Sequence, residues 1–472
     1  MILEFFKQIS KIPRASFQEE KIADYLVDFA STRNLEVIRD ELNNVIIKKP
    51  ASEDYQEAAP VILQGHTDMV AEKNKDSDHN FETDPLTLIE EDGWLSADNT
   101  TLGADDGVAV AYMLAILDDT SLKHPPLECV FTVQEEVGLI GAVELDVSSL
   151  KGRRLIGLDS SGEHQTTISS TGGSRAYVTF PIRYEKTYKN RITVKVKGLK
   201  GGHSGQDIDQ ERGNAIKIAG ELFYNLLQEY EVALHLIDGG LKENAIPREA
   251  ELILGVKSDQ VQAVLEELKL LEEKLKTVYL ISDSGFYLEI AHEQKDTYTL
   301  GYDQNNRIAN LWYLMPYGYF HKSFVIEGLT LSSCNIGTIR TEENAINIAL
   351  SIRSPQPYLM NKTRNAIKIA CDAFGAEVEL TDGYPGWDYD PNSRLRETLL
   401  ETYKELYNTD MQLEATHGGL ELGIFKGKLP DLDIVAFGPI MHDIHTPQER
   451  LDIGSFKRTY QLLVNLLENL RN

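Results

Sequence analysis

The stretch VILQGHTD (residues 61–68) begins as a short apolar run and ends in polar residues, and the same pattern recurs along the chain. Three later apolar runs also lead into polar residues: Cys129–Val133 into Glu135 and Glu136, Leu155–Leu158 into Asp159, and Ile434–Phe437 into His442 and His445. Between the first two runs, Gly107–Asp118 is apolar at helical spacing. Strands that alternate with helices predict an α/β fold with a mainly parallel sheet flanked by helices.

The position of the polar residues, directly after predicted strands, indicates a functional site. In open α/β sheets, ligands bind beyond the carboxyl ends of the strands. Each motif alone has a simpler interpretation, since His66-Thr67-Asp68 is typical of a turn and the acids of GADDG (103–107) are typical of a helix N-cap. Four such clusters at four strand ends favour one common site over four unrelated turns.

The residue types in these clusters are those of a metal site. Zinc prefers histidine nitrogen and carboxylate oxygen, and two-metal hydrolases hold their ions about 3.5–4 Å apart. The adjacent acids Glu135 and Glu136 allow one carboxylate to bind metal while the other handles protons. Spacing alone leaves open whether His442 or His445 is the second histidine ligand.

The sequence resembles the family of two-zinc peptidases that includes carboxypeptidases, aminoacylases and dipeptidases. The matching motifs are GHTD (65–68), GADDG (103–107), EE (135–136), Asp159 and HTP (445–447). Within this family the sequence is similar to the aminoacyl-histidine dipeptidases in the segments LKGGHSG (199–205), NAIPREA (244–250), YPGW (384–387) and HGGLELG (417–423). The resemblance covers almost the whole chain, and it implies a two-zinc exopeptidase-like catalytic domain with an inserted α+β lid domain.

The resemblance also implies the ligands of the metal site. His66, Asp105 and Asp159 would bind one Zn²⁺ ion. Asp105, Glu136 and His445 would bind the second ion, so that Asp105 bridges the two. Mn²⁺ or Co²⁺ could occupy the same ligands.

Five further residues receive roles from the resemblance. Asp68 would orient the first zinc-binding histidine, and Glu135 would be the general base. In the inserted domain, His203 would stabilise the developing oxyanion, while Asn244 and Arg353 would hold the backbone and the C-terminal carboxylate of the substrate. The guanidinium of Arg suits a carboxylate because its fork binds both oxygens.

Two positions depart from the pattern of other relatives. Several relatives have Asn at the position of Asp106, and other branches have Lys at the position of Gly107. The second difference favours the dipeptidase branch over the aminoacylases, and neither difference removes a ligand.

With 472 residues, the chain is too long for one hydrophobic core. We predict a catalytic domain formed by residues 1–184 and 383–472, and an inserted lid or dimerisation-type domain, residues 185–382, which could contain two similar α+β subdomains. The hexapeptide NAIKIA occurs at 214–219 and again at 365–370, either as a trace of a duplication or by chance.

Two local patterns near the N-terminus also predict structure. Residues 16–32 have helical spacing, and Ser16 with Glu19 resembles a capping box. Leu35–Lys49 has the pattern of a hairpin that turns at Asn43-Asn44.

Composition excludes several classes of function. A total of 47 Lys and Arg against 74 Asp and Glu gives a formal net charge of −27, which argues against nucleic-acid binding. The 3 cysteines argue against a disulfide framework. No apolar stretch is long enough for a membrane span and no signal-peptide pattern is present, so we expect a cytoplasmic protein. No phosphate-binding loop is present, which argues against a nucleotide cofactor.

The expected activity is metal-dependent hydrolysis of dipeptides of the Xaa-His type, with two Zn²⁺ ions per chain and a short peptide as substrate. A homodimer is the expected assembly. One alternative is an aminopeptidase or tripeptidase of broader specificity, which would share every metal ligand. A catalytically inactive relative that binds peptides is another alternative, against which the intact ligands and Glu135 argue.

Overall fold

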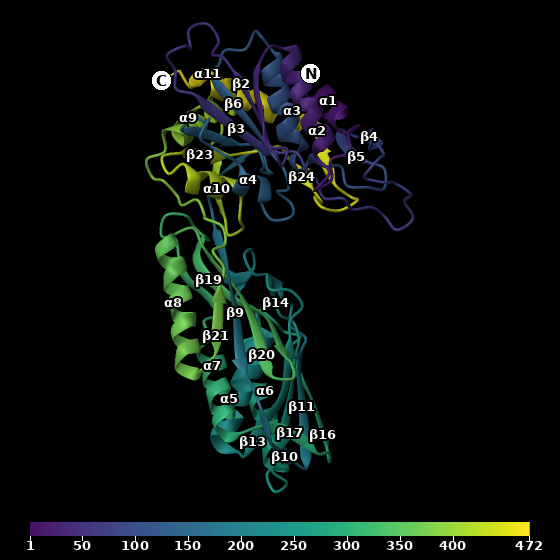
Figure 1. Ribbon diagram of the computed structural model, residues 1–472, viewed down its shortest axis with the longest axis vertical. Coiled ribbons are helices and arrows are strands. Elements are labelled where there is room, and N and C mark those ends of the chain that lie inside the picture. Colours follow the sequence, from purple (N-terminus) through teal and green to yellow (C-terminus); the bar gives the residue numbers. More distant parts are fainter. Residues whose placement is uncertain (472) are drawn as a thin grey trace. The chain divides into compact units, whose positions relative to one another are not determined.

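The structure, a computed structural model, describes residues 1–471, and the chain divides into two compact units (Figure 1). Unit 1 contains residues 1–170, 387–415 and 420–471, and unit 2 contains residues 171–386 and 416–419. The inserted unit therefore begins before the predicted boundary at 185, because strand β9 (Gly172–Pro181) belongs to its sheet.

Unit 1 is built on an eight-stranded sheet. In spatial order its strands are β1 (Glu36–Arg39), β2 (Val45–Lys49), β6 (Leu127–Thr132), β3 (Val61–His66), β7 (Arg154–Gly157), β23 (Asp433–Ala436), β8 (Gln165–Ser170) and β22 (Gln412–Thr416). The central strands β6, β3, β7 and β23 are parallel, so their carboxyl ends lie at one edge of the sheet. The predicted α/β class is confirmed, and all four apolar runs form strands of this sheet.

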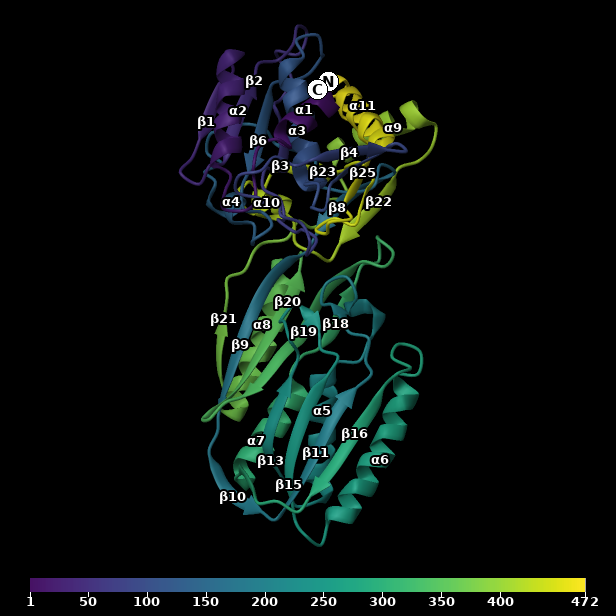
Figure 2. The ribbon, with the colours of Figure 1, turned by 90° about the vertical axis from the view of Figure 1, so that its right-hand side faces the viewer.

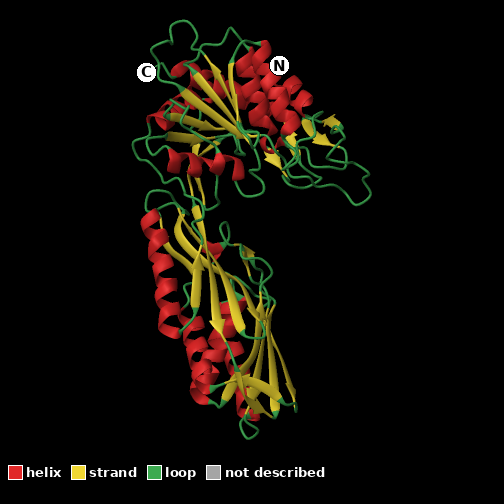
Figure 3. Cartoon of the chain, in the orientation of Figure 1, coloured by secondary structure: helices red, strands yellow, loops and turns green. Residues whose placement is uncertain are grey.

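Helices cover both faces of the unit 1 sheet (Figures 1 and 3). On one side of the sheet lie α1 (Ile2–Ile9), α2 (Glu20–Thr32), α3 (Ala104–Asp118), α9 (Arg394–Tyr407) and α11 (Ile453–Asn469), and on the other side lie α4 (Ile140–Glu144) and α10 (Glu421–Lys428). Helix α3 is buried on all sides because it lies between the sheet and helices α1 and α11. A four-stranded sheet is formed by β24 (Met441–His442), β25 (Arg450–Asp452), β5 (Trp94–Ala97) and β4 (Leu88–Glu91).

The two predictions near the N-terminus have different outcomes. Strands β1 and β2 pair as the expected antiparallel hairpin. The capping-box prediction is wrong, because α2 begins without a side-chain cap and the Ser16 hydroxyl donates to Asp68 at 2.8 Å. A distant carboxylate, which the local sequence does not reveal, competes for this hydroxyl.

Unit 2 is built on a second large sheet, covered on one face by helices (Figure 2). In spatial order its strands are β16 (Tyr287–Glu293), β11 (Asn190–Lys197), β15 (Ala250–Val256), β13 (Val232–Gly239), β19 (Thr330–Thr341), β20 (Ala345–Ser354), β9 and β21 (Glu377–Leu380), with β18 (Gly318–Lys322) paired to β19. The helices are α5 (Ala215–Glu229), α6 (Val261–Val278), α7 (Tyr302–Leu314) and α8 (Pro357–Phe374), with a short 3₁₀ turn at Ile208–Gln210. Two small ribbons pair β10 (Tyr184–Tyr188) with β17 (Thr297–Leu300) and β12 (Gly202–His203) with β14 (Ala245–Ile246).

Unit 2 contains two halves with the same order of elements. The chain order β11-α5-β13-β15-α6-β16 gives the spatial order β16-β11-β15-β13. The chain order β9-α7-β19-β20-α8-β21 gives the reverse spatial order, β19-β20-β9-β21. Each half is thus a strand-helix-strand-strand-helix-strand unit, and the halves meet where β13 pairs with β19.

The repeated hexapeptide does not mark this internal similarity. Its first copy begins at Asn214, the N-cap of α5, which is the first helix of its half. Its second copy, residues 365–370, lies within α8, the second helix of the other half. The copies occupy non-equivalent positions, so the match is a coincidence of helical patterning.

The structure contains, among residues 1–471, no helix that combines the length and the hydropathy of a membrane span.

The packing of α7 against α5 yields a prediction about stability. Trp312 is fully buried, and its ring lies where a side chain at Gly220 of α5 would be. We expect Trp312→Ala to lower the free energy of unfolding of unit 2 by about 3–5 kcal/mol, because it leaves a cavity. Denaturant unfolding followed by circular dichroism measures this change. Leu314→Ala, on the exposed side of the same helix, is the control and should unfold like the wild type.

Candidate active site

His66 is the last residue of β3, and its ring is held from two sides. The side chain is 1% exposed. Its Nδ1 lies 3.1 Å from the Asp68 carbonyl oxygen, and its Nε2 lies 3.0 Å from Asp105 Oδ1. A ring that donates from Nδ1 to a backbone carbonyl presents Nε2 in the manner of a metal-binding histidine.

Asp68 is fully buried beside His66 and accepts several hydrogen bonds. The backbone N–H of Glu135 donates to Oδ1 at 3.1 Å, and that of Glu136 donates to Oδ2 at 3.4 Å. Burial would raise the pKa of Asp68, but hydrogen bonds from His66 and Ser16 hold it below its ordinary value. Asp68 therefore ties the end of β3 to the segment after β6 and remains ionised.

Asp105 lies at the start of α3 and contacts both histidines through different oxygens. Its Oδ1 is 3.0 Å from His66 Nε2, and its Oδ2 is 3.0 Å from His445 Nε2. Burial would raise the pKa of Asp105, but these two hydrogen bonds lower it below its ordinary value. A carboxylate shared in this way has the arrangement of a bridging metal ligand.

His445 is the histidine that lies among the carboxylates. Its Nε2 is also 3.0 Å from Glu136 Oε1, and ligand atoms of Asp105, Glu136 and His445 all lie within 4.8 Å of one another. Hydrogen bonds to Asp105 and Glu136 raise the pKa of His445 to about 10. His442 instead is exposed and packs on Trp94, with the ring centroids 5.4 Å apart.

Asp159 follows β7 and completes a second group. Ligand atoms of His66, Asp106 and Asp159 lie within 4.8 Å of one another. Both oxygens of Asp106 accept backbone N–H groups, from His66 at 3.2 Å and from Ala109 at 3.4 Å. The carboxylate of Asp159 makes no hydrogen bond within residues 1–471, so Asp159 is the freer ligand of the two.

The charges in this cluster favour a bound cation. Burial and the neighbouring Asp105 raise the pKa of Asp159 to about 7. Burial and the carboxylates of Asp159, Glu421 and Glu136 raise the pKa of Glu135 well above its ordinary value, although His66 opposes this. Carboxylates that cannot all ionise next to one another, together with two histidine nitrogens, form a donor set that fits divalent metal ions.

His203 lies in unit 2, on the short strand β12. Its Nδ1 accepts backbone N–H groups from Gly205 at 3.3 Å and from Gln206 at 3.2 Å. Burial, and then the charge of Arg353, lower its pKa. The ring is therefore neutral and carries its proton on Nε2, which suits a hydrogen-bond donor.

Arg353 is a buried cation in unit 2 that has no carboxylate partner. The side chain is 7% exposed, and no ion pair to it is present within residues 1–471. Its hydrogen bonds are long: 3.5 Å to the Tyr384 hydroxyl, 3.4 Å to the His417 carbonyl and 3.5 Å to the Ser204 hydroxyl. The Nε has no partner. A buried guanidinium with weak partners is suited to bind an anionic group of a ligand.

Asn244 is exposed at the end of a loop whose backbone is fixed. Its carbonyl accepts the Ser204 N–H at 2.9 Å, next to His203. The buried amide of Asn335 donates to the carbonyls of Glu243 at 3.2 Å and Ala245 at 2.9 Å, on either side of Asn244. The structure thus brings Ser204, and with it His203, close to Asn244 within unit 2.

Sequence reasoning left two buried residues of the HGGLELG segment without a role. Glu421 is 2% exposed and accepts from Gln64 at 2.6 Å and from Thr132 at 2.7 Å, the residues of β3 and β6 that lie just below the site. His417 is 8% exposed, with Nε2 2.7 Å from the Ser333 hydroxyl and Nδ1 without a partner. The Gly-rich segment itself was the only sequence signal for these residues.

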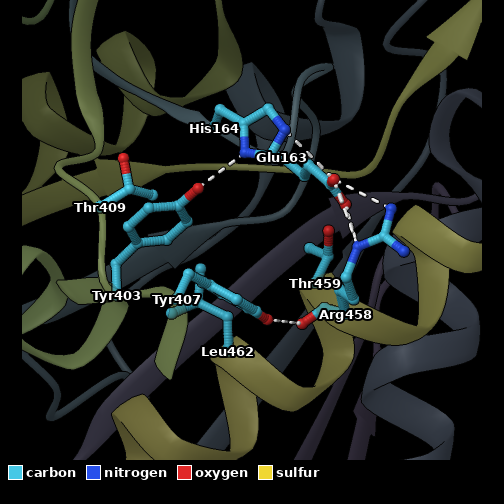
Figure 4. Close-up of a pocket in the computed structure, with 8 residues that line it drawn as sticks. All are labelled: Glu163, His164, Tyr403, Tyr407, Thr409, Arg458, Thr459 and Leu462. Carbon is cyan, nitrogen blue, oxygen red and sulfur yellow. Dashed lines mark hydrogen bonds and ion pairs between the residues drawn. The ribbon is translucent and has the colours of Figure 1, made fainter. Parts of the chain in front are cut away.

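A separate hollow in unit 1, of about 180 Å³, contains none of the predicted site residues (Figure 4). Glu163 pairs there with Arg458 at 2.9 Å, and His164 lies 2.7 Å from the Tyr403 hydroxyl. These groups satisfy one another, so we assign the hollow no role in the reaction.

Known proteins show the same combination of sequence and fold. A model of the peptidase family M20/M25/M40 matches residues 62–469. A cytosol non-specific dipeptidase from Escherichia coli (strain K12) is 33% identical over 99% of this chain and 97% of its own length. The chain is also similar to the crystal structure of an aminoacylhistidine dipeptidase from Vibrio alginolyticus, with 33% identity and a TM-score of 0.92. The match covers 99% of this chain and 96% of that chain.

A more distant structure shares the fold alone. The aminopeptidase PepT from Bacillus cereus is 16% identical, with a TM-score of 0.58 over 100% of this chain and 98% of that chain.

The buried ring of His417 leads to a prediction about acid stability. Burial, and then the charge of Arg353, lower its pKa to about 3, whereas the pKa of a histidine in an unfolded chain is about 6.5. The unfolded state therefore binds the proton first, and unit 2 loses stability as the pH falls from about 6.5 towards 3. We expect His417→Asn to reduce this loss in thermal melts between about pH 7 and pH 4. The control is His292→Asn, which replaces an exposed histidine and should leave the loss of stability unchanged. If the wild type and His417→Asn lose stability equally as the pH falls, the buried ring of His417 is not neutral.

Proposed function

The chain belongs to the peptidase family M20/M25/M40, and on this premise we propose that it cleaves Xaa-His dipeptides with two Zn²⁺ ions bound per chain. Members of this family are metallopeptidases. Two relatives that match the chain over 99% of its length are named as dipeptidases. The predicted class of enzyme, a metal-dependent dipeptidase, is thereby confirmed.

We assign the ligands of the two ions from the family resemblance, and the geometry of unit 1 supports this assignment. His66, Asp105 and Asp159 would hold one ion, and Asp105, Glu136 and His445 would hold the other. One observation carries this proposal: Asp105 contacts both histidines through different oxygens. Its Oδ1 lies 3.0 Å from His66 Nε2, and its Oδ2 lies 3.0 Å from His445 Nε2. Asp106 also lies close to His66 and Asp159. It does not compete with Asp105 as a metal ligand, because each of its oxygens accepts a backbone N–H group.

When bound, the metal ions would act as Lewis acids that polarise the peptide carbonyl and lower the pKa of water. Glu135 would accept a proton from the attacking water and deliver it to the leaving amine nitrogen. Two observations support this role. Ligand atoms of Glu135, Glu136 and His66 lie within 4.8 Å of one another. The pKa of Glu135 is also raised well above its ordinary value, mainly by burial, and a carboxylate with a raised pKa accepts a proton more readily.

Residues of unit 2 would bind the substrate. The Nε2–H of neutral His203 would donate to the developing oxyanion, which stabilises the transition state more than the ground state. Arg353, a buried cation without a carboxylate partner among residues 1–471, would bind the C-terminal carboxylate of the peptide. Asn244 would bind the peptide backbone. A role of unit 2 as a lid that excludes water stays a prediction.

The most specific part of the proposal is that the enzyme prefers histidine as the second residue of the dipeptide. The two dipeptidases described above differ in their names, since one is called non-specific and the other is called an aminoacylhistidine dipeptidase. A broader aminopeptidase or tripeptidase activity would use the same ligands. A catalytically inactive peptide-binding relative is disfavoured because every ligand and Glu135 are present in one cluster.

We also propose a cytoplasmic location, since the relative from Escherichia coli is named as a cytosol enzyme. The homodimer stays a prediction, which light scattering on the purified protein would measure.

A substrate panel tests the proposed function. Purified protein with added Zn²⁺ should cleave alanyl-histidine and β-alanyl-histidine faster than other dipeptides, tripeptides or N-acetyl amino acids. A chelator should abolish cleavage. Alanyl-histidine amide should be a poor substrate, because it lacks the carboxylate that Arg353 would bind. Faster cleavage of tripeptides would move the chain to the broader alternative, and bound metal without any cleavage would favour the inactive relative.

The role of Glu135 has its own test. We expect Glu135→Gln to lower kcat by about 10²- to 10⁴-fold, because the amide cannot accept a proton. The metal content, measured by mass spectrometry, should stay at the wild-type value. Glu163→Gln, which changes a buried carboxylate outside the site, should retain wild-type kcat. A Glu135→Gln protein with wild-type kcat and full metal content would rule out the assignment.

A further inference from the structure

The carboxylate of Glu449 binds the four backbone N–H groups that lead into α3. Its Oε2 accepts from Leu102 at 2.7 Å and Gly103 at 3.0 Å, and its Oε1 accepts from Ala104 at 2.8 Å and Asp105 at 3.4 Å. The side chain is 2% exposed. The N–H groups at the start of a helix have no partner within the helix. One buried acid therefore satisfies the whole segment that carries Asp105.

Glu449 also anchors the segment that carries His445. This segment is exposed: the His445 side chain is 46% exposed, and residues 442–445 all lie on the surface. Asp443 and His445 have positive φ angles of 55° and 62°, which most side chains disfavour. The turn closes where the Glu449 N–H donates to the Thr446 carbonyl at 3.0 Å. Glu449 is thus the buried end of an exposed turn.

Arg14 forms a second buried link to the segment that carries Asp105. Its Nη1 donates to the carbonyls of Thr67 at 2.9 Å and Asp68 at 3.3 Å, and its Nη2 donates to that of Gly103 at 2.6 Å. A side-chain carbon at Gly103 or Gly107 would lie 2.6 Å or 2.7 Å from this Nη2. The two glycines that enclose the acids of the GADDG segment therefore leave room for Arg14.

We propose that Glu449 is a positioning residue that fixes His445 relative to Asp105 and thereby sets the affinity for the metal ion between them. This inference rests on the proposed function, in which both residues bind metal. Loss of a group that orients metal ligands lowers metal affinity about 10- to 100-fold. The ion held by His66, Asp105 and Asp159 depends less on Glu449, because His66 and Asp159 lie at or just beyond the ends of buried strands and only Asp105 lies in the segment that Glu449 binds.

The experiment compares zinc binding by the wild type, Glu449→Gln and Glu163→Gln. The first substitution keeps the size of the side chain but leaves it only one accepting oxygen, so some of the four N–H groups lose their partner. Glu163→Gln alters a buried carboxylate of the same unit that pairs with Arg458. Affinities are measured by competition with a chromophoric chelator, and the zinc retained after dialysis is measured by mass spectrometry. Circular dichroism and thermal melts report the folded state.

We expect Glu449→Gln to lose about 10- to 100-fold in affinity for one ion and to retain the other, while Glu163→Gln binds both ions like the wild type. Two wild-type affinities in Glu449→Gln would overturn the inference and leave the proposed function intact. An equal loss of both ions with a lower melting temperature would overturn it too, since that indicates general destabilisation. If Glu449→Gln does not fold, Glu449→Asp, which keeps the charge on a shorter side chain, should show the same selective loss. A wild-type protein that binds no metal would overturn the proposed function and this inference together.

Discussion

The crowding of carboxylates at the carboxyl edge of the unit 1 sheet is the constraint on which the rest of the structure depends. Asp105, Glu136 and Asp159 lie there with two histidines. When neighbouring carboxylates are buried, each makes ionisation of the others less favourable. Burial together with Asp105 raises the pKa of Asp159 to about 7. A divalent cation relieves this repulsion, so the metal dependence of the family follows from the position in which the fold holds these acids.

The fold holds them by two means. The parallel strands β3, β6 and β7 bring His66 and the acids that follow β6 and β7 to the carboxyl edge of the sheet. The neighbouring buried strands fix the backbone there. Asp105 lies at the start of a helix instead, and His445 lies on an exposed turn. Buried polar side chains connect these less regular segments to the strands, because unpaired backbone groups in the interior would be costly.

Unit 2 contains a buried cation rather than a cluster of carboxylates. Its buried cation, Arg353, lacks a carboxylate partner among residues 1–471, and its histidine His203 is neutral. An isolated buried charge costs free energy unless a ligand or a partner compensates it. An anionic ligand is one group that would compensate the charge of Arg353. The two similar halves of unit 2 form one continuous sheet, in which Arg353 lies on β20, while His203 lies on the short strand β12.

The sequence by itself determined the α/β class and the four strands that precede the candidate site residues, because apolar runs and helical periodicity are local signals. The proposed set of metal ligands came from the family resemblance. Residue spacing left His442 and His445 as equals, and only the family resemblance pointed to His445, while the local pattern mistook Ser16 for a helix cap. The tertiary structure places His445 beside Asp105 and pairs Ser16 with Asp68, and both contacts join segments far apart in the chain. The same holds for the similarity between the two halves of unit 2, which shows in the strand order and not in the repeated hexapeptide. Contacts between residues far apart in the chain leave no periodic pattern, so only the folded chain reveals them.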